Sequence, residues 1–104
     1  MPIIKLTTDT FDAEIKTCGV TALVNFEAEW CTHCKTLIPI LEQIDHNVGG
    51  KAKLYTVNVD DDPVIAAKLG ITSIPTLLFF KTGEICAKIV GLRPEKDILQ
   101  ALDL

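Results

Sequence analysis

Two cysteines, Cys31 and Cys34, are separated by only two residues, Thr32 and His33. The apolar segment before them, residues 20–28, is typical of a buried strand, and the residues after them have helical spacing. Cys31 therefore falls at the predicted start of a helix, where unpaired amides and the helix dipole stabilise a thiolate, the nucleophile of disulfide exchange. Cys34 lies nearly one turn further on the same side, so it can close a disulfide with Cys31 or expel a substrate from a mixed disulfide.

The composition fits one self-contained core and argues against several function classes. With 104 residues, 48% of them apolar, the chain can bury a core without disulfide staples, so we expect a single domain over residues 1–104. A net charge of −4 opposes nucleic-acid binding, which needs clustered lysine and arginine. No segment approaches the roughly 20 apolar residues that span a bilayer, and no secretory signal is present. If the chain is complete, we expect a cytoplasmic monomer without a nucleic-acid or membrane partner.

The remaining pattern alternates strand-like and helix-like segments. Three strands separated by helices are expected to lie parallel, and the last two strands, joined by Thr82-Gly83, to form an antiparallel hairpin. We therefore expect an α/β fold with a mixed central sheet. The predicted strands span residues 3–6, 20–28, 53–59, 76–81 and 84–90, and the predicted helices span residues 9–17, 31–48, 63–69 and 94–102.

Helix ends and irregularities are indicated by a few aspartates and prolines. Asp9 and Asp62 are predicted to be N-caps, the second with Pro63 at the first helical position. Pro39 lies within the long predicted helix and is expected to kink it. The run 60–62 is three aspartates, which raises the alternative of a calcium site, but the proline that follows favours a helix cap.

Several separated motifs resemble those of the thioredoxin family, and together they cover essentially the whole chain. This resemblance implies the thioredoxin fold, a mixed sheet with three parallel strands and an antiparallel hairpin, flanked by helices on both faces. It also implies that Cys31 attacks and Cys34 resolves. The motifs are Phe26 with Ala28-Glu29-Trp30-Cys31, Cys34-Lys35, Pro39, Asn58-Val59-Asp60, Gly70 with Ile74-Pro75-Thr76, Lys81 with Gly83-Glu84, and Gly91.

The resemblance further implies how a substrate is bound. Pro75 is expected to be cis and to pack beside the dithiol, so that the backbone of Ile74 pairs with an extended substrate. The family acts on disulfide-containing proteins and is recharged by a separate electron donor of the thioredoxin reductase type, without a cofactor of its own. We expect an apolar docking patch, a usual sign of an interaction site, formed by Trp30, Ile74, Val90, Gly91 and Leu92.

The residues between the cysteines depart from the family pattern, which has Gly-Pro where this chain has Thr32 and His33. A histidine at this position resembles disulfide isomerases and bacterial oxidants. Protonated His33 would stabilise the Cys31 thiolate and make the couple more oxidising; alternatively, His33 is merely solvated. Lys35, which follows the second cysteine as in the family, is counted among the residues that modulate the site.

A second departure concerns a buried acid. Asn25 occupies the position where thioredoxins carry an acid that relays the proton of the resolving cysteine, and Thr56 replaces the lysine that pairs with that acid. We expect the two neutral side chains to be able to hydrogen-bond, because a lone buried charge would cost several kcal/mol. Deprotonation of Cys34 is then left to water, His33 or Glu29. Alternatively, Asn25 is a satisfied core amide without a catalytic role.

Four further side chains receive simpler interpretations. Glu27 stands where many thioredoxins have an aromatic residue, and we expect it on the surface beside Trp30. Cys18 and Cys86 are expected to pack in the core as small hydrophobic residues. His46 is expected to be solvated on the polar side of the long helix.

Three other functions compete with a disulfide reductase. The nearest is a more oxidising oxidase or isomerase, which His33 favours and the missing export signal disfavours. A metal-binding module is a second alternative, but a structural zinc site normally needs four ligands and no second pair occurs at a familiar spacing. The third is a non-catalytic interaction subunit that uses only the docking patch around Trp30 and Ile74.

Overall fold

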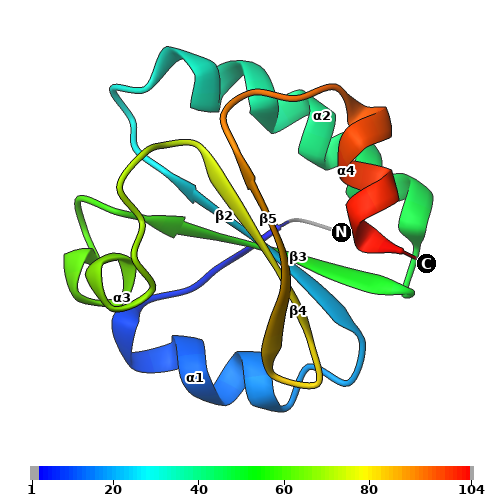
Figure 1. Ribbon diagram of the computed structural model, residues 1–104, viewed down its shortest axis with the longest axis horizontal. Coiled ribbons are helices and arrows are strands. Elements are labelled where there is room, and N and C mark those ends of the chain that lie inside the picture. Colours follow the sequence, from blue (N-terminus) through cyan, green and yellow to red (C-terminus); the bar gives the residue numbers. More distant parts are fainter. Residues whose placement is uncertain (1–2, 104) are drawn as a thin grey trace.

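A computed structural model describes residues 3–103, which form a five-stranded sheet and four helices (Figure 1). Their order, β-α-β-α-β-α-β-β-α, is the predicted one. Among these residues, no helix has the length and apolar character needed to cross a bilayer. The strands are β1 (Ile4–Lys5), β2 (Thr21–Glu27), β3 (Ala52–Asn58), β4 (Thr76–Lys81) and β5 (Glu84–Val90), and the helices are α1 (Thr8–Lys16), α2 (Thr32–Val48), α3 (Pro63–Lys68) and α4 (Glu95–Leu102).

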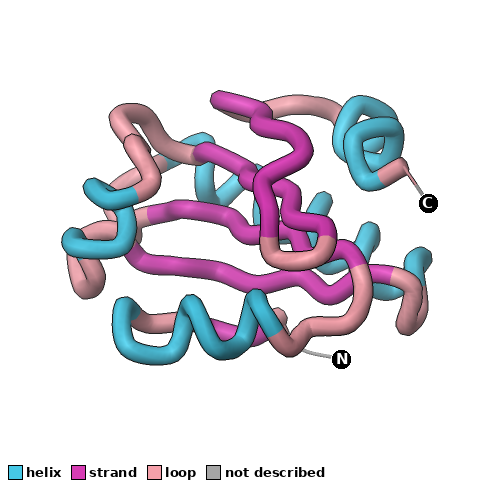
Figure 2. The backbone as a smooth tube through the Cα atoms, turned by 60° about the horizontal axis from the view of Figure 1, so that its bottom comes forward, coloured by secondary structure: helices cyan, strands magenta, loops and turns pink. Residues whose placement is uncertain are grey.

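The strands follow one another across the sheet in the order β1-β3-β2-β4-β5. β1 and β2 are both parallel to β3, whereas β4 is antiparallel to β2 and β5 is antiparallel to β4. The mixed sheet with three parallel strands and a terminal hairpin is therefore confirmed. Helices cover both faces: α1 and α3 lie on one side and α2 and α4 on the other (Figures 1 and 2).

The central strand β2 is buried on both faces, and it leads directly to the cysteines. Because side chains alternate along a strand, Val24 and Phe26 pack with α1 and α3, while Leu23 packs with α2 and α4. All three are fully buried, and each such side chain contributes about 1.5–3 kcal/mol by leaving water. Asn25 lies on the same face as Leu23 and is the polar exception within this strand's buried stretch. The end of β2 is thus held rigidly from both sides.

The N-cap of the first helix lies two residues before the predicted one. Thr7, not Asp9, is the N-cap: its side chain accepts a hydrogen bond from the Thr10 amide, and the Thr10 hydroxyl accepts one from the Thr7 amide. This reciprocal capping box satisfies two amide donors that Asp9 alone would not. Asp9 instead lies in the first turn, where its charge is favourable to the helix dipole.

The hairpin between β4 and β5 turns at Thr82 and Gly83, whose positive φ angles of 51° and 82° suit a tight hairpin turn. β5 is an edge strand, and only its Ala87 and Ile89 side pack against the core of α2 and α4. Cys86 lies on the opposite, uncovered side and is exposed, so the expectation that it packs in the core was wrong.

The burial of individual side chains tests the remaining predictions for Cys18 and His46. Cys18 is buried as expected, and its sulfur lies 3.5 Å from the hydroxyl of Tyr55. His46 is exposed on α2, in agreement with the prediction, and Pro39 lies inside that helix. On α4, Leu99 is 36% exposed, whereas Ile98 and Leu102 are fully buried.

Candidate redox site

The two cysteines lie where β2 gives way to α2, at the N-terminus of the helix. Cys31 is the N-cap residue, with extended backbone angles, and its sulfur accepts a hydrogen bond from the Cys34 amide at 3.2 Å. The two residues form a disulfide, with their Cα atoms 5.2 Å apart. Both are buried, Cys31 to 6% and Cys34 to 1% exposure. A thiolate on Cys31 would therefore meet an amide donor and the positive end of the helix dipole.

The short connection between strand and helix fixes the position of Cys31. Its amide donates to the Ala28 carbonyl at 3.2 Å, and its own carbonyl accepts the first bond of the helix, from the Lys35 amide, at 3.2 Å. Thr32, His33 and Lys35 are all exposed on the first turn. These three predicted modulators thus face solvent, whereas Asn25 and Pro75, the other two, are buried.

The Ile74–Pro75 peptide bond is cis, as the family resemblance implied, and Pro75 is buried. The Pro75 carbonyl accepts a hydrogen bond from the Gly91 amide at 2.8 Å, and the next residue, Thr76, is paired with Val90 in the sheet. These contacts bring the end of β5 beside the proline loop. Packing of Pro75 against the dithiol itself remains a prediction.

The docking patch is largely exposed. Trp30 is 69% exposed, and it lines one groove of about 390 Å³ together with Ile74. Val90 and Leu92 are 45% and 36% exposed. Gly91, which lies between them in the chain, links this segment to the proline loop through its hydrogen bond to the Pro75 carbonyl. The structure therefore joins Trp30 to Ile74 in one groove and joins residues 90–92 to that loop through the backbone.

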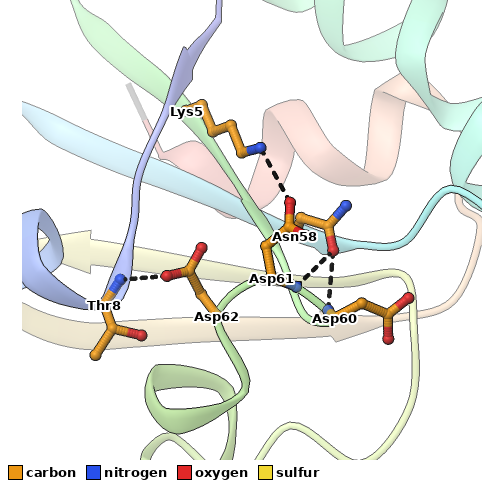
Figure 3. Close-up of polar contacts among 6 residues, drawn as sticks. All are labelled: Lys5, Thr8, Asn58, Asp60, Asp61 and Asp62. Atoms are coloured by element: carbon orange, nitrogen blue, oxygen red, sulfur yellow. Dashed lines mark hydrogen bonds and ion pairs between the residues drawn. The ribbon is translucent and has the colours of Figure 1, made fainter.

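Each aspartate of the 60–62 run is engaged by a different partner. The Trp30 indole N–H donates to Asp60 Oδ2 at 2.8 Å, and Lys5 Nζ lies 3.2 Å from Asp61 Oδ2. Asp62 occupies the N-cap position of α3 without a side-chain cap bond; its Oδ1 accepts from the Thr8 amide at 2.9 Å instead (Figure 3). Within residues 3–103, no three metal-binding side chains gather into a cluster.

The expected hydrogen bond between Asn25 and Thr56 does not form, although the two residues are paired in register across β2 and β3. Asn25 Nδ2 donates to Glu27 Oε1 at 3.1 Å. Asn25 Oδ1 and Thr56 Oγ1 are buried without a hydrogen-bond partner among the described residues. The prediction of a neutral bonded pair was wrong because Glu27, two residues along the same strand face, takes the amide donor.

Two contacts were missed by sequence reasoning. Glu27 was expected beside Trp30, but its carboxylate faces Asn25; the i, i+2 spacing on a strand was the signal that could have found this contact. The Trp30–Asp60 bond joins residues thirty positions apart, and nothing in the local pattern pointed to it. It fixes the orientation of the indole at the edge of the docking patch.

This arrangement makes and breaks a disulfide, and the chain is a thiol–disulfide oxidoreductase. The Thioredoxin family model matches residues 2–104. The thioredoxins of Staphylococcus epidermidis and Staphylococcus haemolyticus are each 43% identical to it, and that of Staphylococcus aureus is 41% identical. Each of these alignments covers 99% of this chain and 97% of the relative. The chain belongs to the thioredoxin family.

Proposed function

We propose that this protein reduces disulfides in other proteins, with Cys31 as the attacking and Cys34 as the resolving cysteine. The observation that carries the assignment is their unequal placement at the start of α2. Cys31 caps the helix and its sulfur accepts the Cys34 amide, so its thiolate is the stabilised one. Cys34 lies within the first turn and is 1% exposed, which suits attack on a partner already bound to Cys31.

The proposed cycle moves two electrons from the dithiol to the substrate. The Cys31 thiolate attacks one sulfur of the substrate disulfide, that bond breaks, and the first substrate thiolate leaves and takes a proton. Cys34, once deprotonated, attacks the Cys31 sulfur of the mixed disulfide. The second substrate thiol is released, and Cys31 and Cys34 are left as the disulfide.

We place the substrate over the docking patch of Trp30, Ile74, Val90, Gly91 and Leu92. An extended segment would pair with the backbone of Ile74, while its side chains cover the apolar groove beside Trp30. The exposure of Trp30 and the groove it shares with Ile74 support this placement. Members of the family act on disulfide-containing proteins, and we propose substrates of this kind for this chain.

The direction of exchange is proposed to be reductive, with a separate donor of the thioredoxin reductase type restoring the dithiol. The full-length similarity to proteins named thioredoxin supports a reductase over an oxidase or isomerase. A reducing compartment, the cytoplasm, fits two cysteines that remain unpaired, Cys18 and Cys86. We further propose that the chain acts as a monomer.

The test is turnover of a disulfide-bonded protein with dithiothreitol as the reductant. Wild-type protein should accelerate reduction catalytically, and Cys31→Ser should leave only the uncatalysed rate. A Cys31→Ser variant as active as wild type would reject the dithiol mechanism in favour of an interaction subunit. Cys86→Ser is the matched control, since Cys86 lies on the uncovered side of β5, and it should retain full turnover.

A further inference from the structure

A space lined by both polar and apolar side chains lies between the sheet and α2. We call it the inner groove; it has a volume of about 280 Å³, and its lining includes Asn25, Glu27, Thr56 and Glu42. Asn25 Oδ1 and Thr56 Oγ1 are buried and have no protein partner among the described residues. Since a water molecule occupies about 30 Å³ in the liquid and needs polar partners, the groove can hold water bound to these oxygens.

A second space, the outer groove, borders the resolving cysteine. It has a volume of about 420 Å³, and its lining includes Glu27, Glu29, Cys34, Lys35 and Asn58. Glu27 lines both grooves. Glu27, whose carboxylate accepts a hydrogen bond from the buried Asn25 amide, is therefore also a lining residue of the space that borders Cys34.

Resolution of a mixed disulfide needs a proton acceptor for Cys34, and Asn25 cannot serve as one because an amide does not take up a proton. We propose that Glu27 accepts this proton through water in the outer groove, and that Asn25 is a positioning residue that holds the Glu27 carboxylate. The inference rests on the proposed resolving role of Cys34.

The proton and electron balance of this step is simple. The Cys34 proton passes through water to Glu27, the Cys34 sulfur bonds to the Cys31 sulfur, and the bond between Cys31 and the substrate breaks. The departing substrate thiolate then recovers a proton from Glu27, which returns to its carboxylate form. Because a free carboxyl ordinarily has a pKa about four units below that of a free thiol, proton transfer must accompany sulfur attack rather than precede it.

The charged groups that line the two grooves around Glu27 come from α2 and from the loop that follows β2. Lys35 and Glu42 approach from α2, and Glu29 from the loop that follows β2. β3 contributes only the neutral side chains of Thr56 and Asn58. Glu29 is the other carboxylate that lines the outer groove, so the variants must separate Glu27 from Glu29.

The test is a single-turnover reaction of reduced Cys86→Ser protein, which lacks the exposed free thiol, with 5,5′-dithiobis(2-nitrobenzoate). The reagent releases one coloured thiolate when Cys31 attacks and a second when Cys34 resolves. At pH 7, Glu27→Gln should slow the second release by about tenfold, toward the lower end of the effect of a general base, and leave the first unchanged. At pH 9.5 the deficit should shrink to within about twofold, because the thiol then ionises without a base. Glu27→Asp should restore part of the rate.

Two controls distinguish this role from general electrostatics. Glu29→Gln removes a neighbouring charge in the outer groove, and Glu84→Gln removes one at the exposed start of β5. The proposal is overturned if Glu27→Gln resolves at the wild-type rate, if Glu29→Gln slows resolution equally, or if the deficit stays the same at pH 9.5. Failure of wild-type protein to complete the first release would instead count against the proposed function, so the two failures are separable.

Discussion

The two faces of the central sheet treat buried polar groups differently. On the face toward α1 and α3, the Tyr55 hydroxyl donates to Glu14 at 3.0 Å and lies 3.5 Å from the Cys18 sulfur. On the face toward α2, Asn25 and Thr56 each keep a buried oxygen without a partner among the described residues. On the first face, which we call the closed face, the buried polar group is hydrogen-bonded by other side chains of the protein. On the second, the open face, the two buried oxygens are available to bind water.

This contrast follows the location of the chemistry. A buried polar group without a partner costs about 1–3 kcal/mol, so a sheet built only for stability would satisfy both faces equally. The open polar groups lie on the face that carries the resolving cysteine, where protons must be exchanged. The sealed face holds Cys18, a thiol without a role in the proposed cycle.

The largest difference in turnover should appear between variants in which one cysteine on each side of the sheet, Cys34 or Cys18, is replaced. Cys34→Ser is expected to abolish multiple turnover of a protein disulfide, because the substrate remains bound to Cys31. Cys18→Ala should keep turnover within about twofold of wild type while lowering the free energy of unfolding by about 1 kcal/mol, the value of a small lost contact. Steady-state rates and urea titrations of both variants provide the comparison, and a Cys18→Ala variant without turnover would refute it.

Tyr55→Phe tests the closed face. We expect it to lower the free energy of unfolding by about 1–2 kcal/mol, since Glu14 and Cys18 lose the hydroxyl that they share. Burial, with the hydrogen bonds to Cys18 and Glu14, raises the pKa of Tyr55. Its neutral form therefore stabilises the fold below the ordinary tyrosine pKa of about 10, and this contribution is lost as the pH rises further.

Urea titrations at pH 7 and pH 11 check this prediction. The difference in unfolding free energy between wild-type protein and Tyr55→Phe should narrow at the higher pH. A difference that widens would show that Tyr55 is not kept neutral by the fold.

His33→Pro tests whether an exposed residue between the two cysteines sets the reduction potential of the dithiol. Loss of the positive charge that a protonated imidazole places near the Cys31 thiolate should destabilise the reduced form. The reduction potential should then fall by about 30 mV, which for two electrons corresponds to about 1.4 kcal/mol. Equilibration with glutathione measures the shift, and an unchanged or higher potential in the variant would leave His33 as a solvated residue.

Thr56→Val should have the smallest effect. Because Thr56 Oγ1 has no hydrogen-bond partner within residues 3–103, we expect the free energy of unfolding to change by less than about 0.5 kcal/mol, in contrast to Tyr55→Phe. Thermal or urea unfolding measures it. A loss of more than about 1 kcal/mol would mean that the hydroxyl is as firmly bonded as Tyr55 and would remove the contrast between the faces.

The sequence predicted the regular elements well where the local signal was unambiguous. β4 and β5 were placed at their observed bounds, since two alternating apolar runs flank the turn at Thr82 and Gly83. The start of α1 was displaced because Thr7 and Asp9 are both good caps, and the hydroxyl of Thr10 decides between them. Such a choice depends on a three-residue geometry that residue preferences alone do not rank.

The site was predictable in its covalent chemistry and not in its surroundings. The positions of Cys31 and Cys34 followed from the spacing and the strand-to-helix junction, and the cis bond before Pro75 followed from the family resemblance. The partner of Asn25 did not, because the expected pair and the observed contact with Glu27 are equally allowed by strand geometry. Only the positions of the side chains separate them.

In the proposed cycle, Cys31 is the cysteine that attacks the substrate disulfide. The most direct measurement is mass spectrometry of the adduct formed when reduced Cys34→Ser protein, with the exposed Cys86 also replaced by serine in every variant, meets a disulfide-bonded peptide. We predict one peptide per chain, attached to Cys31, and no adduct on the Cys31→Ser protein under the same conditions. An adduct of similar yield on Cys34 in the Cys31→Ser protein would contradict the assignment.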